Sequence, residues 1–396
     1  MKPEILLLSA ASGYGHIRAA ETLKLHLERD YPDVIVSHEN LCRYTSRQIK
    51  WLIESGWERA STAPAIRSIY SYMHYYLSSS KYFAKLVTVL SSRIGRRLDG
   101  AHRDRNIKAV VVLHPAGVGP AIQWKRRRTF TLHVIATDFV LHAFQCQSEV
   151  DFVFAAKQII ASGDDARRRQ IGSNYIEAGI PVDISPSTKT RRTSATDGRP
   201  FILVSFGAKG IAHQNSIKYI ADKLALLDVN VHFLCGMNKD FSRYIRHNYK
   251  EEITKRKFSV HGFEKDVSYL YRISDIFIGK AGGISISEAI AAGIDIIVTE
   301  CLPGQEEVNL NYLLQRGLGV DGRGAAKFER EIENALFRIE SRKSERVLPF
   351  FTEQLSAVEI IAREIVRKIP ECIITASPGL PSAGADAKPR LRRQRV

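Results

Sequence analysis

Short apolar runs, each followed by a segment whose apolar residues recur at helical spacing, are found along most of the 396-residue chain. In the first half they occupy residues 5–9, 109–113, 131–136 and 152–155, and in the second half residues 201–206, 231–235, 258–260, 276–278 and 296–299. Continuous apolar runs of this length are typical of strands that are buried on both faces of a parallel sheet. The alternation of strands with helices therefore predicts an α/β fold with two parallel sheets.

A polar segment separates the two sets of strands. Residues 185–200 contain almost no apolar side chain, which indicates a solvated linker. We therefore expect an N-terminal domain at 1–185, a linker at 186–199 and a C-terminal domain at 200–350. The helical pattern at 351–370 predicts a helix that packs back on the first domain, and the composition of 371–396 predicts a disordered basic tail. Two such Rossmann-like domains would face a central cleft at the carboxyl ends of their strands.

The charge of the chain indicates an anionic partner. Lys and Arg number 58 and Asp and Glu 42, a formal net charge of +16, which suits nucleic acid, acidic lipid or a phosphorylated substrate. No apolar stretch approaches the roughly 18 residues that a spanning helix needs, and the N-terminus lacks the pattern of a signal peptide. The five cysteines are scattered without a Cys-x-x-Cys pair. We expect a cytoplasmic protein that meets a membrane only at its surface.

The first motif is the run Ser-Gly-Tyr-Gly-His at residues 12–16, between the first strand and the first helix. Its glycines, Gly13 and Gly15, would let a ligand approach the backbone closely. The third glycine of a dinucleotide fingerprint is absent, which disfavours nicotinamide binding. His16 could remove a proton from an acceptor hydroxyl as a neutral imidazole, and a capping or structural role is the alternative.

The second motif follows the strand at 276–278 and reads GKAGGISISEA. The backbone amides at Gly282 and Gly283 and the start of the following helix suit a diphosphate. Ser285 adds a hydroxyl donor, and the Glu288 carboxylate can accept both hydroxyls of a ribose. An ordinary capped turn between a strand and a helix is the alternative.

The third motif, PGQEEVN at residues 303–309, follows the next strand of the same sheet. It places Gln305, Glu306 and Asn309 at the carboxyl edge of that sheet. Polar residues gathered at this edge favour ligand binding.

GGISISEA and PGQEEVN, about twenty residues apart, resemble the nucleotide-sugar signature of the monogalactosyldiacylglycerol synthases and the processive diacylglycerol glucosyltransferases. The muramyl-lipid N-acetylglucosaminyltransferases are more distant relatives. The run SGYGHIRAAETL at 12–23 is similar to the acceptor-side loop of the same family, and the resemblance runs in order from about residue 5 to residue 320. The chain departs from the family's Pro-Gly-Gly-Ser-Thr at Ala281, Ile284 and Ser285, and from its glycine-richer loop at 206–210.

This resemblance implies an inverting glycosyltransferase of the GT-B type, with a UDP-hexose donor in the second domain and a diacylglycerol acceptor in the first. It implies Asp138 as the first choice of base and His16 as the second, and a donor pocket that includes Gly13, Gly15, Gly207 and Gly210. Uracil would meet backbone groups at Phe263, the diphosphate Gly282, Gly283 and Ser285, the ribose Glu288, and the sugar or phosphate Gln305, Glu306 and Asn309. No metal or other cofactor is expected, and the chain contains no Asp-x-Asp.

Two segments of the first half mix aromatic with cationic residues, namely 64–98 and the run Trp-Lys-Arg-Arg-Arg at 124–128. Such mixtures suit the headgroup layer of an anionic membrane, and a solvated helix face is the alternative. With the resemblance, they predict a peripheral location on the inner face of the cell membrane.

Three other functions remain open from the sequence. The acceptor could be a polyprenyl-linked lipid or another glycolipid, or the chain could sense a sugar nucleotide without turnover. A basic nucleic-acid-binding protein would explain the charge. Because it leaves GGISISEA and PGQEEVN unexplained, we expect no nucleic acid among the partners.

Overall fold

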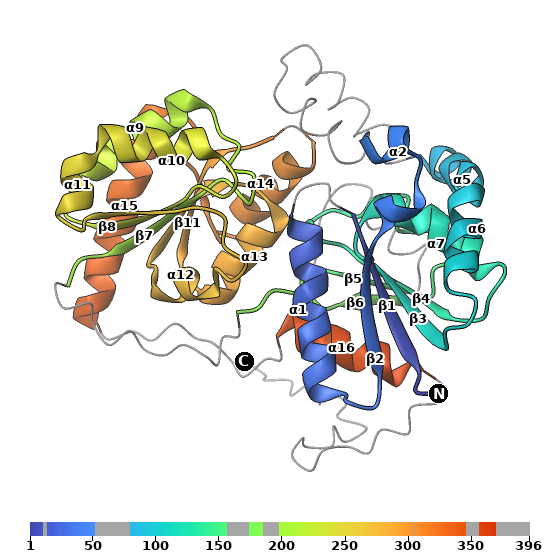
Figure 1. The fold of residues 1–396 in the computed structure, drawn as a ribbon. Helices are drawn as coiled ribbons and strands as arrows, with labels where there is room; N and C mark the ends of the chain where they lie inside the picture. The colour runs from blue at the N-terminus through green and yellow to red at the C-terminus, as the bar shows by residue number, and fades with distance from the viewer. Residues whose placement is uncertain are drawn as a thin grey trace, which may run out of the picture.

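The computed structural model describes residues 1–10, 14–51, 80–156, 174–184, 198–302, 304–345 and 356–369. The tail expected at 371–396 and all but residues 198 and 199 of the linker expected at 186–199 lie outside these ranges. The described residues form two parallel six-stranded sheets with helices around them (Figure 1). This confirms the predicted α/β class.

The first sheet has the strand order β2-β1-β3-β4-β5-β6, and every neighbouring pair is parallel. Its strands are β1 (Glu4–Ser9), β2 (Ile35–Asn40), β3 (Ile107–Val112), β4 (Thr131–Ile135), β5 (Phe152–Ala155) and β6 (Tyr175–Glu177). Its helices are α1 (Gly15–Asp30), η1 (Leu41–Tyr44), α2 (Arg47–Trp51), α5 (Lys81–Leu90), α6 (Ser92–Ala101), η3 (Pro115–Gly117) and α7 (Val118–Lys125).

The second sheet has the order β12-β11-β10-β7-β8-β9, again with parallel pairs. Its strands are β7 (Phe201–Ser205), β8 (Asn230–Leu234), β9 (Phe258–His261), β10 (Ile276–Lys280), β11 (Asp295–Glu300) and β12 (Val320–Asp321). Its helices are α9 (Gln214–Leu226), α10 (Lys239–Asn248), α11 (Lys250–Thr254), α12 (Ser268–Ile273), α13 (Gly283–Ala292), α14 (Gln305–Gln315) and α15 (Ala325–Glu345).

The last described helix, α16 (Ala357–Arg367), follows α15 in the chain but packs against α1 of the first domain (Figure 1). It begins with a capping box in which Ser356 and Glu359 satisfy each other's backbone amides. Its buried face includes Ile361 and Ile365, which share a core cluster with Leu23 of α1. Burial of this apolar stripe is what holds the end of the described chain on the first domain.

The order of strands reverses once in each sheet, beside the first strand of each domain. β1 lies between β2 and β3, and β7 lies between β8 and β10. In open parallel sheets, ligands bind in the crevice at the carboxyl ends of the two strands where the order reverses. The loops that follow β1, β3, β7 and β10 are therefore the ones that should form a site.

The two domains are packed against each other in this structure. One buried apolar cluster contains Leu6 and Val110 of the first sheet together with Phe277 and Ile286 of the second domain. Helix α1 of the first domain also contacts α13 of the second. The loops at the carboxyl edges of the two sheets consequently face each other.

The prediction that residues 124–128 form a membrane patch is wrong for Trp124, the aromatic residue of the run. Trp124 is 2% exposed, and its ring lies 4.9 Å from the ring of Phe130 in the core. Of the cations beside it, Lys125 pairs with Asp151, Arg126 with Glu149 and Arg128 with Asp99. The aromatic residue of the run is therefore a core residue, whereas Arg126, Arg127 and Arg128 are exposed, so only its cations could meet a membrane.

The other segment expected to meet a membrane, at 64–98, lies outside the described residues up to residue 79. Within the described part of the chain, no helix is both long and apolar enough to cross a membrane. Four of the five cysteines are described, and all four are buried and form no disulfide.

Candidate active site

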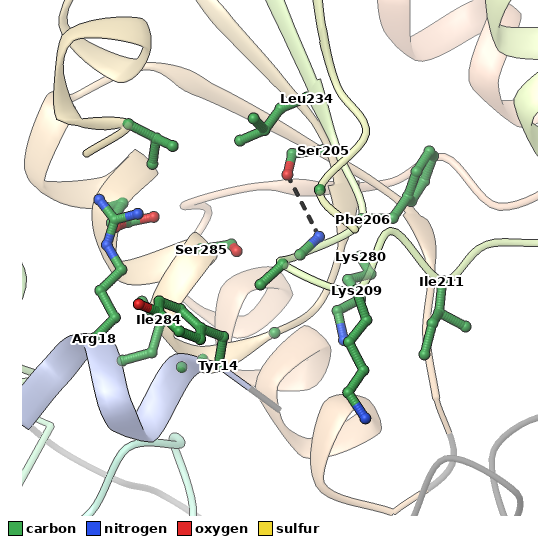
Figure 2. A pocket seen from close by; sticks show the side chains of 18 of the residues that line it. Tyr14, Arg18, Ser205, Phe206, Lys209, Ile211, Leu234, Lys280, Ile284 and Ser285 are labelled. Atoms are coloured by element: carbon green, nitrogen blue, oxygen red, sulfur yellow. Dashed lines mark hydrogen bonds and ion pairs between the residues drawn. The ribbon is translucent and has the colours of Figure 1, made fainter. Parts of the chain in front are cut away.

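A pocket lies between the two domains, at the carboxyl edges of both sheets. The first domain contributes the start of α1 and the loop after β4, and the second contributes the loops after β7, β9 and β10 with the starts of α13 and α14. Figure 2 shows Arg18 of α1 on one side, Lys209 and Lys280 on the other, and Ser285 of α13 between them. The loops after β1, β7 and β10 line the pocket as the reversal of strand order predicts, and in the first domain the loop after β4 takes the place expected for the loop after β3.

His16 stands in the first turn of α1 and lines the pocket. Its Nδ1 lies 2.8 Å from the carbonyl oxygen of Leu113 and 2.8 Å from Oγ1 of Thr137. A carbonyl oxygen can only accept, so Nδ1 carries the proton and Nε2 keeps its lone pair. Burial lowers the pKa of His16, while the charge of Asp138 and the bond to Leu113 oppose this shift. The fold thus presents a neutral imidazole in the tautomer that a base requires.

Asp138 lies three residues after Ile135, the last residue of β4, and lines the same pocket. Its Oδ1 accepts a hydrogen bond of 2.9 Å from Nδ2 of Asn309. The Asn309 side chain also donates to the carbonyl oxygen of Ala281 and accepts from the amide of Phe139, each over 2.9 Å. Asn309 is fully buried, so it fixes the Asp138 carboxylate and joins the two domains.

Gly283, the first residue of α13, approaches the first domain so closely that a side chain cannot fit. A Cβ at this position would lie 2.1 Å from the carbonyl oxygen of Thr137 and 2.8 Å from Oδ1 of Asp138. At neighbouring Gly282, the nearest atom to a Cβ would be 3.6 Å away. The requirement for glycine at 283 therefore comes from contact between the domains.

Glu288 lies in the second turn of α13 and is 2% exposed. Nε of Arg18, from the opposite domain, lies 2.8 Å from its Oε1. Apart from this ion pair, Oε1 accepts no hydrogen bond from any described residue. Burial raises the pKa of Glu288, and the positive charge of Arg18 opposes this rise. The site thus contains a buried carboxylate oxygen with unused capacity to accept a hydroxyl.

Lys280 ends β10 and points into the pocket beside Gly207, whose φ of 77° places it in the left-handed region. Its Nζ lies 2.8 Å from Oε1 of Glu306, and Oε2 of Glu306 accepts from the amide of Leu302. Because both oxygens of Glu306 are engaged, this residue orients Lys280.

Most of the residues selected from the sequence meet in this one pocket. Those that line it are Gly15, His16, Asp138, Gly207, Phe263, Gly282, Gly283, Ser285, Glu288, Gln305 and Glu306. Gly210 and Asn309 lie behind its wall, where Gly210 packs against the carbonyl oxygen of Cys235. Gly13 lies outside the described residues.

Four charged residues of the pocket were missed in the sequence, namely the cations Arg18, Lys209 and Lys280 and the carboxylate Glu264. Lys280 carried a usable signal, because it is a cation at the end of a strand beside two glycines. Arg18 is separated from Glu288 by 270 positions and carried no signal for that contact. Among the described residues, no group of three or more His, Cys, Asp or Glu is placed to hold a metal ion.

A family model described as "Glycosyl transferases group 1" matches residues 188–344. The chain is also 24% identical over 338 residues to the processive diacylglycerol beta-glucosyltransferase of Bacillus thuringiensis (strain Al Hakam), covering 80% of this chain and 81% of the relative. An enzyme of the same name from Bacillus pumilus (strain SAFR-032) is 22% identical over 328 residues, covering 80% of this chain and 82% of the relative.

Solved structures show the same fold at low sequence identity. MurG of Acinetobacter baumannii superposes with a TM-score of 0.55 at 14% identity, over 92% of this chain and 100% of that protein. The glycotransferase of kitacinnamycin gives a TM-score of 0.58 at 12% identity, over 93% of this chain and 99% of that one. Together with the matched domain, these similarities confirm the predicted GT-B glycosyltransferase and the resemblance to the diacylglycerol glucosyltransferases.

Proposed function

We propose that the enzyme moves glucose from UDP-glucose to the hydroxyl of diacylglycerol at a membrane surface, with inversion at the anomeric carbon. The names of its relatives support the acceptor and the sugar, because both are processive diacylglycerol beta-glucosyltransferases. UDP-glucose is an α-glucoside, so a β-linked product requires one inversion.

The observation that carries this proposal is the position of His16 in a pocket shared with the start of α13. A base from the first domain and an anion-binding helix start from the second lie on two sides of one space. In the proposed reaction the acceptor oxygen attacks the anomeric carbon and the bond from that carbon to UDP breaks. The acceptor proton passes to Nε2 of His16, and UDP leaves with the bonding electron pair.

Asp138 supports His16 in this proposal. Its charge raises the pKa of the imidazole against the effect of burial, which favours the imidazolium formed when the proton is taken. Its Oδ1 is engaged by Asn309, whereas Nε2 of His16 remains an acceptor. We propose His16 as the base and Asp138 as its electrostatic partner, because the charge of Asp138 acts on the imidazole and one of its two oxygens is already held by Asn309.

The leaving UDP would meet the amides at the start of α13, the hydroxyl of Ser285 and the ammonium groups of Lys209 and Lys280. These groups are fixed before the reaction, so they stabilise developing negative charge without reorganisation. We propose that they suffice without a divalent metal.

The buried carboxylate of Glu288 is proposed to bind the ribose hydroxyls, because its Oε1 has unused acceptor capacity. Glu288→Gln keeps the shape and removes the charge. Since a hydrogen bond to a charged group contributes about 1.5–3 kcal/mol, we expect the KM for UDP-glucose to rise roughly 10- to 100-fold. Steady-state kinetics with varied donor would measure this, and an unchanged donor KM would contradict the ribose assignment.

The acceptor side of the enzyme exposes apolar residues. Helix α5 presents Tyr82, Leu86, Val89 and Leu90 with exposed fractions of 88%, 53%, 60% and 71%, beside Lys81 and Lys85. An amphipathic surface of this kind suits the interface of an anionic membrane. It supports a lipid acceptor that is reached from the membrane surface.

The proposal is tested with purified enzyme and diacylglycerol in anionic vesicles, given UDP-glucose, UDP-galactose or UDP-glucuronate separately in the presence of a chelator. We expect UDP release and glucosyldiacylglycerol, identified by mass, from UDP-glucose. Product only from UDP-galactose would change the sugar. No product from any donor, while UDP still binds, would reject diacylglycerol and favour another lipid acceptor or a sensing role.

A further inference from the structure

A second hollow of the molecule lies beside the donor pocket, on the second domain alone. Its walls are the loop after β8, one side of α10, the start of α11, and residues 262 and 263 after β9. It shares Gly236 and Phe263 with the donor pocket. We call this hollow the α10 groove.

The side chains of the α10 groove are strongly basic. Lys239, Arg243, Arg246, His247 and Lys250 line it, and all five are exposed. Their spacing along α10 and into α11 repeats at three or four residues, so the side chains lie along one face. The described lining contains no Asp or Glu.

These charges are poorly compensated within the chain. The side chains of Lys239, His247 and Lys250 meet no hydrogen-bond or ion-pair partner among the described residues. Arg243 pairs with Asp240 over 2.7 Å, but that carboxylate is 86% exposed, and exposed pairs contribute little. Like charges on neighbouring helical turns repel, so an anion in the groove would relieve this repulsion.

The backbone around the groove is held in place. Oδ1 of Asn238 accepts from the amide of Phe241 and caps α10, while its Nδ2 donates to the carbonyl oxygen of Gly210. Gly236 has a φ of 59° and approaches the carbonyl oxygen of Ala208. The cationic side chains therefore project from a fixed backbone, so the positions from which they reach a ligand are set before it arrives.

We propose that the α10 groove binds the phosphate group of an anionic phospholipid at the membrane surface. The groove is open, and Met237 on its rim is 54% exposed, so an apolar side chain stands beside the cations. Cations mixed with an exposed apolar residue suit the headgroup region. In Figure 1, α10 and α5 both lie on the upper side of the view, in different domains. Contact through both would keep the pocket between them at the membrane.

The test uses the full chain with UDP present in excess, so that the donor pocket is occupied. Binding is measured by co-sedimentation with vesicles that contain phosphatidylglycerol and with vesicles of phosphatidylcholine alone. Each lysine near an anionic surface contributes roughly a factor of five, so Lys239→Gln with Lys250→Gln should weaken binding about 25-fold. Lys218→Gln with Lys255→Gln removes the same charge from exposed positions of the same domain outside the groove.

The proposal is supported if vesicle binding falls strongly in the variant with both groove lysines replaced and only slightly in the control variant. Equal losses in both pairs would overturn it, because the effect would then belong to the total charge. Glycerol phosphate serves as a soluble probe in a parallel calorimetric titration. If Lys239→Gln with Lys250→Gln weakens the binding of glycerol phosphate but leaves vesicle binding unchanged, the proposed phospholipid ligand is rejected. The groove would then bind a soluble phosphate compound.

Discussion

Replacing His16 by alanine is expected to lower kcat/KM for glucosyl transfer about 1,000-fold, because general bases contribute between roughly 100- and 10,000-fold. The imidazole is held by the carbonyl oxygen of Leu113 and by Thr137, so a water molecule in its place would lack both the position and the basicity. Donor binding should persist, because the second domain supplies most of the pocket. Single-turnover transfer and UDP titration would separate the two effects.

The pH dependence of kcat/KM gives an independent test of the same role. His16 must be neutral to accept a proton, so activity falls tenfold per pH unit as pH drops below its pKa. Burial lowers that pKa from 6.5, so the acid limb should lie below pH 6.5. Asp138→Asn removes the charge that raises the pKa of His16, so the limb should move to still lower pH.

Two comparisons make the test of the base specific, one with His26→Ala and one with Asp138→Asn. His26 lies on the same helix as His16 and does not line the pocket, so His26→Ala should leave transfer nearly unchanged. If Asp138 were the base, Asp138→Asn would lose as much activity as His16→Ala and the acid limb would disappear. That outcome would restore the order of candidates that the sequence resemblance favoured.

Much of the site could be predicted from the sequence because its residues follow strands. In a parallel sheet, the residue after a strand lies at the carboxyl edge whatever the rest of the fold does. His16, Gly282 and Glu288 each lie in or after a loop that ends such a strand, and all three line the pocket. The local pattern of apolar strand, glycine and helix start was therefore sufficient to predict that these residues belong to the site.

The contacts between the domains could not be predicted in this way. Asn309 meets Asp138, and Arg18 meets Glu288, across separations that are set only when the two domains pack together. Composition also misled at Trp124, where an aromatic residue beside cations proved to be a core residue. Charge and aromatic content describe a segment, whereas burial depends on which of its faces meets the rest of the fold.

The second large effect is expected from Gly283→Ala, which should lower kcat about 100-fold with donor affinity little changed. The added Cβ would lie 2.1 Å from the carbonyl oxygen of Thr137 and 2.8 Å from Oδ1 of Asp138. Both are atoms of the first domain that cannot rotate away together, so the domains must separate by a fraction of an ångström or more. A displacement of about 1 Å between reacting groups can cost about 100-fold in rate.

Gly282→Ala is the matched control, because it adds the same methyl group one residue earlier in the same loop. Its Cβ would meet nothing closer than 3.6 Å, so the domains can still close and kcat should stay near that of the unaltered enzyme. Any effect at 282 should fall on the donor KM, since only a diphosphate at the start of α13 would meet that methyl group. Equal losses of kcat in the two variants would mean that glycine at 283 serves the donor rather than closure. In that case the domain contact at Thr137 would have no part in assembling the site.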